Sequence, residues 1–198
     1  MTRKQTPSQT PSQTVGPYFA YGLTSEQYGY QLDSLAGATL RDDDTAGQRI
    51  RIEGRVFDGN GDPVNDAMIE IWQADDQGRY AHPQDPRGSN SGFKGFGRVG
   101  TGTDPENRFW FDTVKPGAIG EGHAPHINVA VFARGLPSHA YTRIYFADEA
   151  AANGSDAVFT SVPEDRRATL LAQRNGGDGV YRFDIHLQGA NETVFFDV

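Results

Sequence analysis

The sequence contains no cysteine among its 198 residues. Disulfide bonds, thiolate metal ligands and cysteine nucleophiles are therefore excluded. No apolar run approaches the ~20 residues that a transmembrane helix requires, and no apolar segment of the kind found in signal peptides follows the charged amino terminus. We therefore expect a cytoplasmic protein that has no membrane partner.

An excess of positive charge is also absent. The formal net charge is -8, whereas a protein that binds the nucleic-acid backbone needs a basic surface stripe, so we expect no nucleic-acid partner. Several general catalytic motifs are missing as well: the sequence has no Walker A loop, no His-Glu-x-x-His and no Gly-x-Ser-x-Gly. The chemistry of this chain must therefore depend on a more specialised pattern.

Short apolar segments separated by turns are abundant, and the sequence has 24 glycines and 11 prolines. From Arg49 to Phe57, apolar and polar side chains alternate, which predicts a half-buried strand. Further strands are expected over 67–73, 108–111, 127–132, 141–146, 180–187 and 193–196, with a long glycine-rich loop over 88–102. The pattern predicts an all-β fold, a two-sheet β-sandwich.

One short helical excursion is expected within this β-rich pattern. Ser161 and Glu164 have the spacing of a capping box, and Pro163 would lie in the first turn of the helix. Helical periodicity then runs from Arg167 to Arg174 and ends before two glycines.

The first 47 residues differ from the rest. Residues 5–14 repeat Gln-Thr-Pro-Ser, a composition that favours extended backbone over a packed core. The apolar segment 15–19 follows, and aromatic side chains in a free tail would have to stay exposed, so we expect this arm to dock. We divide the chain into an N-terminal arm and lead-in segment at 1–47 and one β-sandwich domain at 48–198.

The stretch 125–129, Pro-His-Ile-Asn-Val, looks like a metal site from which one ligand has been removed. Alternate residues of a strand point to the same face, so His126 and Asn128 share a face. An imidazole at both positions would suit a transition metal, whereas the amide of Asn128 is a poor ligand for a hard metal ion.

Other motifs surround this stretch in a fixed order. Trp-Gln-Ala-Asp at 72–75 leads through Gly78 to Tyr80, and Lys-Pro-Gly-Ala-Ile follows at 115–119. In this order and spacing the chain resembles the intradiol ring-cleaving dioxygenases from about residue 6 to its end. The resemblance implies a β-sandwich fold and an enzyme family that holds non-haem ferric iron with two tyrosinates and two imidazoles.

Matched to that family pattern, the chain keeps only part of the ligand set. Tyr80 and His126 stand where the first tyrosine and the first histidine are expected. The second tyrosine corresponds to Ile119, which has no donor atom, and the second histidine corresponds to Asn128. The resemblance thus implies that this chain binds no metal, and that Tyr80 and His126 belong to a filled relic pocket.

Two neighbouring positions agree with the loss of the metal. His123 stands where a catalytic arginine is expected, and Arg143 stands where the family pattern has a glutamine. The fixed positive charge of Arg143 would repel an iron cation. We therefore expect no catalytic residue on this chain alone.

Within the family, one kind of enzyme contains homologous alpha and beta chains, with ferric iron on the beta chain at their contact. This chain resembles the alpha kind, which implies an iron-carrying beta partner, a higher alpha–beta oligomer and a small aromatic acid, 3,4-dihydroxybenzoate, as substrate. The residues that match the alpha contribution to the substrate pocket are Thr14, Gly16, Pro17, Tyr18 and Arg134.

The residue types in this set suit such a role. Glycine and proline allow a close and fixed backbone approach, Tyr18 offers a ring face and a hydroxyl, and the guanidinium fork of Arg134 matches a carboxylate. Considered by itself, an arginine at a strand end such as Arg134 is usually a solvated charge or a surface ion pair that contributes little, so its assignment to the pocket depends on the resemblance.

Two alternatives remain open at the level of sequence. The chain could be a single-chain intradiol enzyme for catechol or hydroxyquinol, against which Ile119 and Asn128 argue directly. It could also be a non-enzymatic β-sandwich binding module, in which case the motifs at Tyr80 and His126 would be coincidental.

Overall fold

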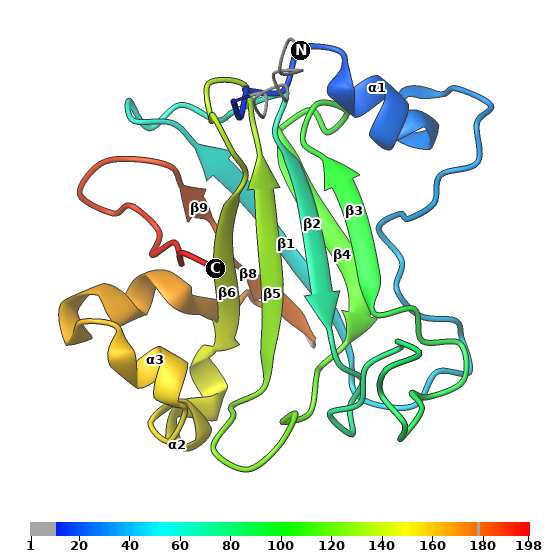
Figure 1. Cartoon of the computed structure of the whole chain (residues 1–198), viewed down its shortest axis with the longest axis vertical. Coiled ribbons are helices and arrows are strands. Elements are labelled where there is room, and N and C mark those ends of the chain that lie inside the picture. Colours follow the sequence, from blue (N-terminus) through cyan, green and yellow to red (C-terminus); the bar gives the residue numbers. More distant parts are fainter. Residues whose placement is uncertain (1–10, 178) are drawn as a thin grey trace, which may run out of the picture.

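Strands dominate the structure, a computed structural model that describes residues 11–177 and 179–198 (Figure 1). The strands are β1 (Arg49–Phe57), β2 (Met68–Gln73), β3 (Phe96–Gly100), β4 (Arg108–Val114), β5 (His126–Phe132), β6 (Ala140–Phe146), β7 (Leu171–Arg174), β8 (Val180–Arg182) and β9 (Ile185–His186). The α-helices are α1 (Phe19–Leu23), α2 (Ala150–Asn153) and α3 (Ala157–Ser161), and the 3-10 helices are η1 (Ser25–Tyr28), η2 (Ala147–Glu149) and η3 (Glu164–Leu170).

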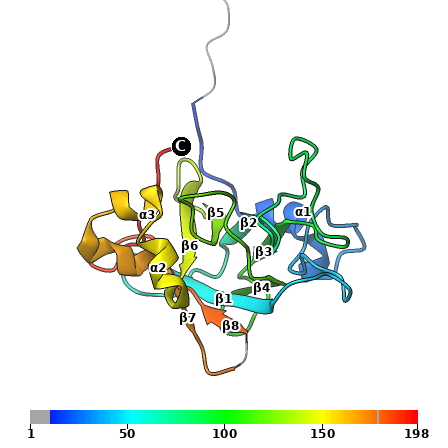
Figure 2. The same cartoon turned by 90° about the horizontal axis from the view of Figure 1, so that it is seen from below.

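The strands are hydrogen-bonded along one path in the order β3-β2-β5-β6-β7-β8-β1-β4, and β9 pairs with β1. Seen along the strands, the part of the sheet with β2, β5 and β6 faces the part with β1 and β8 (Figure 2). The end strands β3 and β4 also approach each other, since a Cβ added to Gly97 would lie 3.0 Å from the Phe111 ring.

The prediction of a mostly β protein with few helices is confirmed by this nearly closed sheet. Pairing continues from β6 through β7 and β8 to β1, so the predicted division into two separate sheets is not confirmed.

The main core fills the space inside the sheet. Alternate side chains of β1 and β4 point inward, among them Ile50, Ile52, Phe109 and Phe111, and all are buried. Each such side chain contributes ~1.5–3 kcal/mol through its removal from water. The alternation in the sequence therefore corresponds to an inward and an outward face.

The predicted helix over 167–174 is wrong. Helical turns occupy η3, but residues 171–174 form β7, in which Leu171 pairs with Tyr145 of β6 and Arg174 pairs with Tyr181 of β8. Strand pairing on both sides outweighs the local helical pattern. The capping box does not form either, because the Ser161 hydroxyl donates to the carbonyl of Val158.

Three other boundaries differ from the prediction. The glycine-rich loop at 88–102 contains β3, whose Gly97 fits where Leu40 and Phe111 leave no room for a Cβ. The predicted strand over 180–187 is split into β8 and β9. The segment 193–196 makes only an isolated bridge, between Phe196 and Tyr141.

The lead-in segment adds structure that the sequence did not predict. It contains α1 and η1, which lie beside the β3 edge of the sheet (Figure 1). Residues 5–10 of the predicted repeat lie outside the described residues. Within the described ranges, no helix has the length and apolar character that crossing a bilayer requires.

We expect Gly54→Ala to destabilise the fold. A Cβ on Gly54 of β1 would lie 1.8 Å from the carbonyl oxygen of Phe183, so the backbone would have to move, at a cost of ~1–3 kcal/mol in the free energy of unfolding. Urea unfolding followed by circular dichroism measures this loss. Gly37→Ala is the matched control, because its added Cβ meets nothing within 4 Å. Equal losses in both variants would contradict the prediction.

Candidate functional site

A row of polar and aromatic side chains crosses the outer face of the sheet. The antiparallel register aligns Phe96, Trp72, Asn128 and Arg143 on β3, β2, β5 and β6. Two residues before Asn128, and therefore on the same face of β5, His126 is paired with Tyr145 of β6. The ladder thus brings the predicted relic positions His126 and Asn128 together with Arg143.

Arg143 connects the strands of this row. Its Nε donates to Oδ1 of Asn128 at 3.0 Å, and its Nη1 lies 3.4 Å from the Tyr145 hydroxyl. The Asn128 amide donates in turn to the Trp72 carbonyl at 3.4 Å. The guanidinium of Arg143 therefore binds Asn128, the position that corresponds to a histidine ligand in the family pattern.

The network continues to a buried carboxylate. The Tyr145 hydroxyl donates to Asp156 at 3.1 Å, and the Asp156 carboxylate also accepts the backbone N–H groups of Ala124, Val158 and Phe159 at 2.9 Å each. Burial opposes ionisation of Asp156, but these donors outweigh it and lower the pKa of Asp156. Asp156 therefore fixes both the start of α3 and the segment before β5.

His126 lies within this buried network as a neutral side chain. Its Nδ1 is 2.8 Å from the Ala124 carbonyl oxygen, which can only accept, so Nδ1 carries the proton. Burial lowers the pKa of His126, and the positive charge of Arg143 acts in the same direction. Burial also raises the pKa of Tyr145 to about 12, so this phenol stays protonated.

The turn before Tyr80 is organised by Asp75, the last residue of the Trp-Gln-Ala-Asp motif. The fully buried Asp75 carboxylate accepts backbone N–H groups from Gln77 and Arg79 at 2.9 Å and from Asn90 at 2.8 Å. The Tyr80 ring that follows is stacked on Trp72, with ring centroids 5.6 Å apart. Burial raises the pKa of Tyr80, against the influence of Asn128 and Arg143.

The loop that carries Ile119 packs against the same turn. Gly78 has φ +72, and a Cβ there would lie 1.9 Å from the Ala118 carbonyl oxygen and 3.2 Å from the Ile119 Cα. Only glycine permits this approach. The turn and the loop are therefore held together, but Ile119 offers a hydrocarbon where the family pattern has a phenolate.

These residues do not fit iron. No group of three or more His, Asp or Glu side chains in the described part of the chain could hold a metal ion. The Asn128 oxygen is occupied by Arg143. A ferric ion would also have to approach the fixed charge of that guanidinium, which its own charge opposes.

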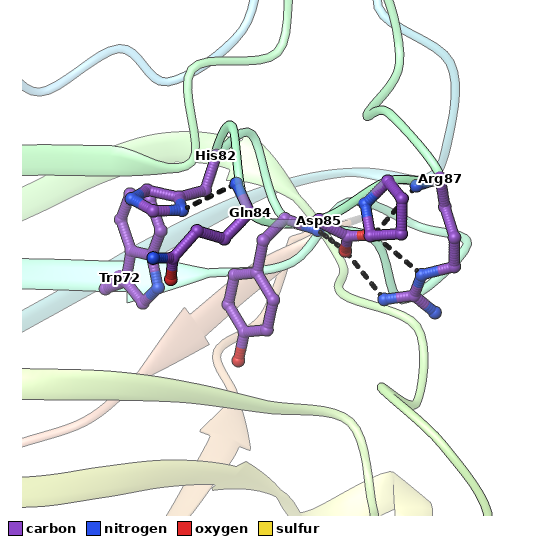
Figure 3. A pocket seen from close by; sticks show the side chains of 7 residues that line it. Trp72, His82, Gln84, Asp85 and Arg87 are labelled. Carbon is purple, nitrogen blue, oxygen red and sulfur yellow. Dashed lines mark hydrogen bonds and ion pairs between the residues drawn. The ribbon is translucent and has the colours of Figure 1, made fainter.

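An open pocket of about 600 Å³ lies beside the stacked pair of Trp72 and Tyr80. His82 stands edge-on to Trp72, with centroids 6.1 Å apart and an interplanar angle of 86°. Figure 3 shows Asp85 and Arg87 turned toward each other, joined by hydrogen bonds of 2.7 and 2.9 Å. The arginine of this pocket is thus already neutralised by Asp85.

The predicted substrate-binding residues lie at the other end of the sheet. Arg134 follows the end of β5, and the backbone N–H of Gly135 donates to the Thr14 hydroxyl at 2.8 Å, which attaches the arm to this end (Figure 1). Because β5 is ~20 Å long, this position is at least that far from His126 at the start of the strand. Arg134 itself is paired with Asp66.

The rest of the arm set is accessible. Gly16 and Pro17 are exposed, and the Tyr18 side chain is 79% exposed. Tyr18 begins a chain of aromatic contacts, with its ring centroid 6.1 Å from that of Tyr21, which lies 4.5 Å from that of Tyr28. The structure thus brings Thr14 to Arg134 and leaves Tyr18 free to meet another molecule.

Sequence reasoning missed the partners of the predicted residues. Tyr145, Asp156 and Asp66 were not singled out, although each contacts a singled-out residue or its immediate neighbour. Asp156 carried one local signal, because an aspartate before a short helix is a good N-cap. Tyr145 and Asp66 have no such signal, since strand pairing alone places them.

Comparison with known proteins agrees with this geometry. The sequence profile of the family described as Dioxygenase matches residues 16–189. The protocatechuate 3,4-dioxygenase alpha chain of Burkholderia cepacia is 55% identical over 193 residues, which cover 96% of this chain and 98% of the relative. The beta chain from the same organism is 32% identical over 183 residues, covering 85% and 77%.

A solved structure shows the same fold. The dioxygenase domain of a carbohydrate-binding fusion protein from Streptomyces sp. SirexAA-E superposes with a TM-score of 0.61 at 29% identity, covering 92% of this chain and 100% of that one. The chain therefore belongs to the intradiol dioxygenase family. The alternative of an unrelated β-sandwich binding module is set aside.

We expect a two-residue graft to fail to create an iron site. Ile119→Tyr with Asn128→His supplies the missing donors, but Arg143 would remain beside the metal. Adding Arg143→Gln removes this charge, so only the triple variant should bind ferric iron and show the visible absorption of a tyrosinate complex. Iron per folded chain is measured by elemental analysis, with circular dichroism as the folding control. Stoichiometric iron in the double variant would refute the role given to Arg143.

Proposed function

We propose that this chain is the alpha subunit of a protocatechuate 3,4-dioxygenase. The complete enzyme would cleave 3,4-dihydroxybenzoate with dioxygen between the two hydroxyl-bearing carbons, to give 3-carboxy-cis,cis-muconate. The almost full-length similarity to an alpha chain supports this assignment. The similarity to a beta chain of the same organism supports a homologous beta partner for this chain.

The observation that carries the proposal is the Arg143 network. A chain whose relic site is closed by an arginine, with Ile119 and Asn128 at ligand positions, does not fit the role of the iron-bearing subunit. The ferric ion of the enzyme is therefore assigned to a homologous beta partner. A single-chain enzyme for catechol or hydroxyquinol, the alternative, would have to bind iron itself. The described residues contain no group of three or more His, Asp or Glu side chains that could hold a metal ion.

The contribution of this chain is assigned to the end of the sheet where the arm is attached. Thr14 anchors the arm at Gly135, so that Gly16, Pro17 and Tyr18 extend from a fixed point. Their exposure leaves them available to form a wall of the partner's pocket. In this wall the guanidinium of Arg134 would face the carboxylate of the substrate.

The surface of the lead-in segment supports an obligatory partner. Large apolar side chains are exposed here, including Tyr18, Tyr30, Leu32 and Leu35, which is 98% exposed. Aromatic side chains that stay exposed in a free chain often become the anchors of an interface. We infer that this segment is covered by the beta subunit within a higher alpha–beta oligomer.

Separate and joint expression tests the proposal. The chain purified alone should contain no stoichiometric iron and should not consume dioxygen with protocatechuate. Co-expressed with an iron-binding beta homologue, it should form a stable complex that carries iron and cleaves protocatechuate. If the chain alone proves to be iron-loaded and active, or if the active beta protein never associates with it, the assignment fails.

We expect Arg134→Ala in the iron-loaded complex to weaken protocatechuate more than catechol, which has no carboxylate. Arg134 lies at an exposed position after β5, where a charge contact contributes ~0.5–1 kcal/mol. Removing the guanidinium also leaves the Asp66 carboxylate unpaired, which repels an anionic substrate, so the KM for protocatechuate should rise a few-fold, more at low salt than at high salt. Equal changes in KM for both compounds would assign Arg134 to assembly instead.

A further inference from the structure

Asp66 and Arg134 face each other just beyond the ladder of β2 and β5. In this antiparallel register Met68 pairs with Phe132. Asp66 stands two residues before Met68 and Arg134 two residues after Phe132, so the same register places them opposite each other. The Nε–H of Arg134 donates to Oδ2 of Asp66, and their side chains are 54% and 23% exposed.

The backbone around Asp66 is held in place. The fully buried Thr101 hydroxyl donates to the Val64 carbonyl at 2.7 Å and accepts the Ala67 N–H at 3.2 Å. These two bonds fix the turn on both sides of Asp66. The carboxylate is therefore presented from a rigid base.

Asp66 also lies beside the arm. The Thr14 hydroxyl is bound by Gly135, the residue next to Arg134. Tyr28 of η1 is near Asp66 as well. The pKa of Tyr28 is raised mainly by burial, and further by the charges of Tyr21 and Asp66. Asp66 thus stands where the arm, the turn before β2 and the end of β5 meet.

We propose that Asp66 is a specificity-determining residue, which makes this wall favour an aromatic acid with one carboxylate over a ring-opened product with three. The inference rests on the proposed function and deepens it. Asp66 produces this preference for the substrate by neutralising the charge of Arg134 before any ligand binds. Four further N–H donors remain on the two Nη atoms of the guanidinium, enough for one bidentate carboxylate.

The change of charge during the reaction gives Asp66 this role. Ring cleavage places one atom of dioxygen on each former hydroxyl carbon, so both carbons become carboxylates and two protons are released. An anion of charge -1 is thus converted to one of charge -3. A lone arginine would attract the product more strongly than the substrate, whereas a paired arginine has little net charge to attract either.

Direct bonds and net charge therefore act differently on the two ligands. The substrate can still gain short hydrogen bonds from the Nη groups of Arg134. Two of the product's carboxylates cannot be accommodated by the same fork, and they meet the negative charge of Asp66 instead. The pair thus selects for the substrate and favours release of the product.

Asp66→Asn in the iron-loaded alpha–beta complex tests this inference. At low salt, we expect the KM for protocatechuate to fall about threefold and the inhibition constant of 3-carboxy-cis,cis-muconate to fall about tenfold or more, because three charges respond instead of one. High salt should reduce both changes. The KM for catechol, which is uncharged, should stay the same.

Two further variants serve as controls. Asp112→Asn removes the same charge from another arginine pair, since Asp112 of β4 accepts from Arg51 at 2.7 Å, and it should leave both constants unchanged. Asp66→Glu keeps the charge and should behave as the unchanged chain. A change with Asp112→Asn as large as that with Asp66→Asn would reduce the effect to overall charge and overturn the inference.

The other outcomes also decide between explanations. A rise in the KM for protocatechuate with Asp66→Asn would mean that Asp66 only positions Arg134. Equal shifts for substrate and product would remove the selectivity. If Arg134→Ala discriminates between protocatechuate and catechol while Asp66→Asn changes nothing, only this inference fails. If Arg134→Ala does not discriminate, the substrate role proposed for Arg134 fails first.

Discussion

The antiparallel ladder of β2, β5 and β6 is the constraint on which both ends of the molecule depend. Its register places Trp72, Asn128 and Arg143 in one row. At the other end, two residues beyond the last pair of β2 and β5, the same register places Asp66 opposite Arg134. A slip of one residue in β5 would exchange the inward and outward faces of that strand. The buried side chains of β5 therefore hold the polar ones in position.

The polar network around Arg143 holds several elements together without a metal ion. A metal ion would join ligands from different segments by coordination. Here the Arg143 guanidinium of β6 is joined to β5 through Asn128, and the neighbouring Tyr145 hydroxyl extends the connection to Asp156 at the start of α3. The Asn128 amide, the Tyr145 hydroxyl and the Asp156 carboxylate each have a partner here, and leaving any of them buried and unpaired would cost ~1–3 kcal/mol. These hydrogen bonds connect the outer face, and the charge of the guanidinium opposes the approach of a cation to Asn128.

The two ends of β5 carry different roles within one chain. At the start of the strand, His126 is buried, and its Nδ1 is bonded to the Ala124 carbonyl of the same subunit. At the other end, Arg134 and Tyr18 are exposed, and the arm is attached nearby through Thr14. Buried side chains cannot contact another chain, whereas exposed aromatic and charged groups are suited to one. This contrast agrees with a subunit that serves a site on another chain.

Much of the fold and part of the site could be predicted from the sequence, because they depend on local pattern. Alternation over 49–57 and 127–132 reports which face of each strand is buried, and it matches β1 and β5 closely. The donor atoms of a side chain are also fixed by the sequence: in any conformation Ile119 has no phenolate and Asn128 has no imidazole. The prediction that these two positions supply no tyrosine or histidine ligand therefore depends on the sequence alone.

Contacts between distant segments were decided only by the tertiary structure. Residues 171–174 have a helical pattern, but β6 and β8 offer hydrogen bonds on both sides, so a strand forms. Likewise, no local sequence pattern predicts the contact of Arg143 with Asn128 or that of Arg134 with Asp66. These pairs exist because strand register brings together residues that are 15 and 68 positions apart. That register depends on packing across the whole core, which no short segment specifies alone.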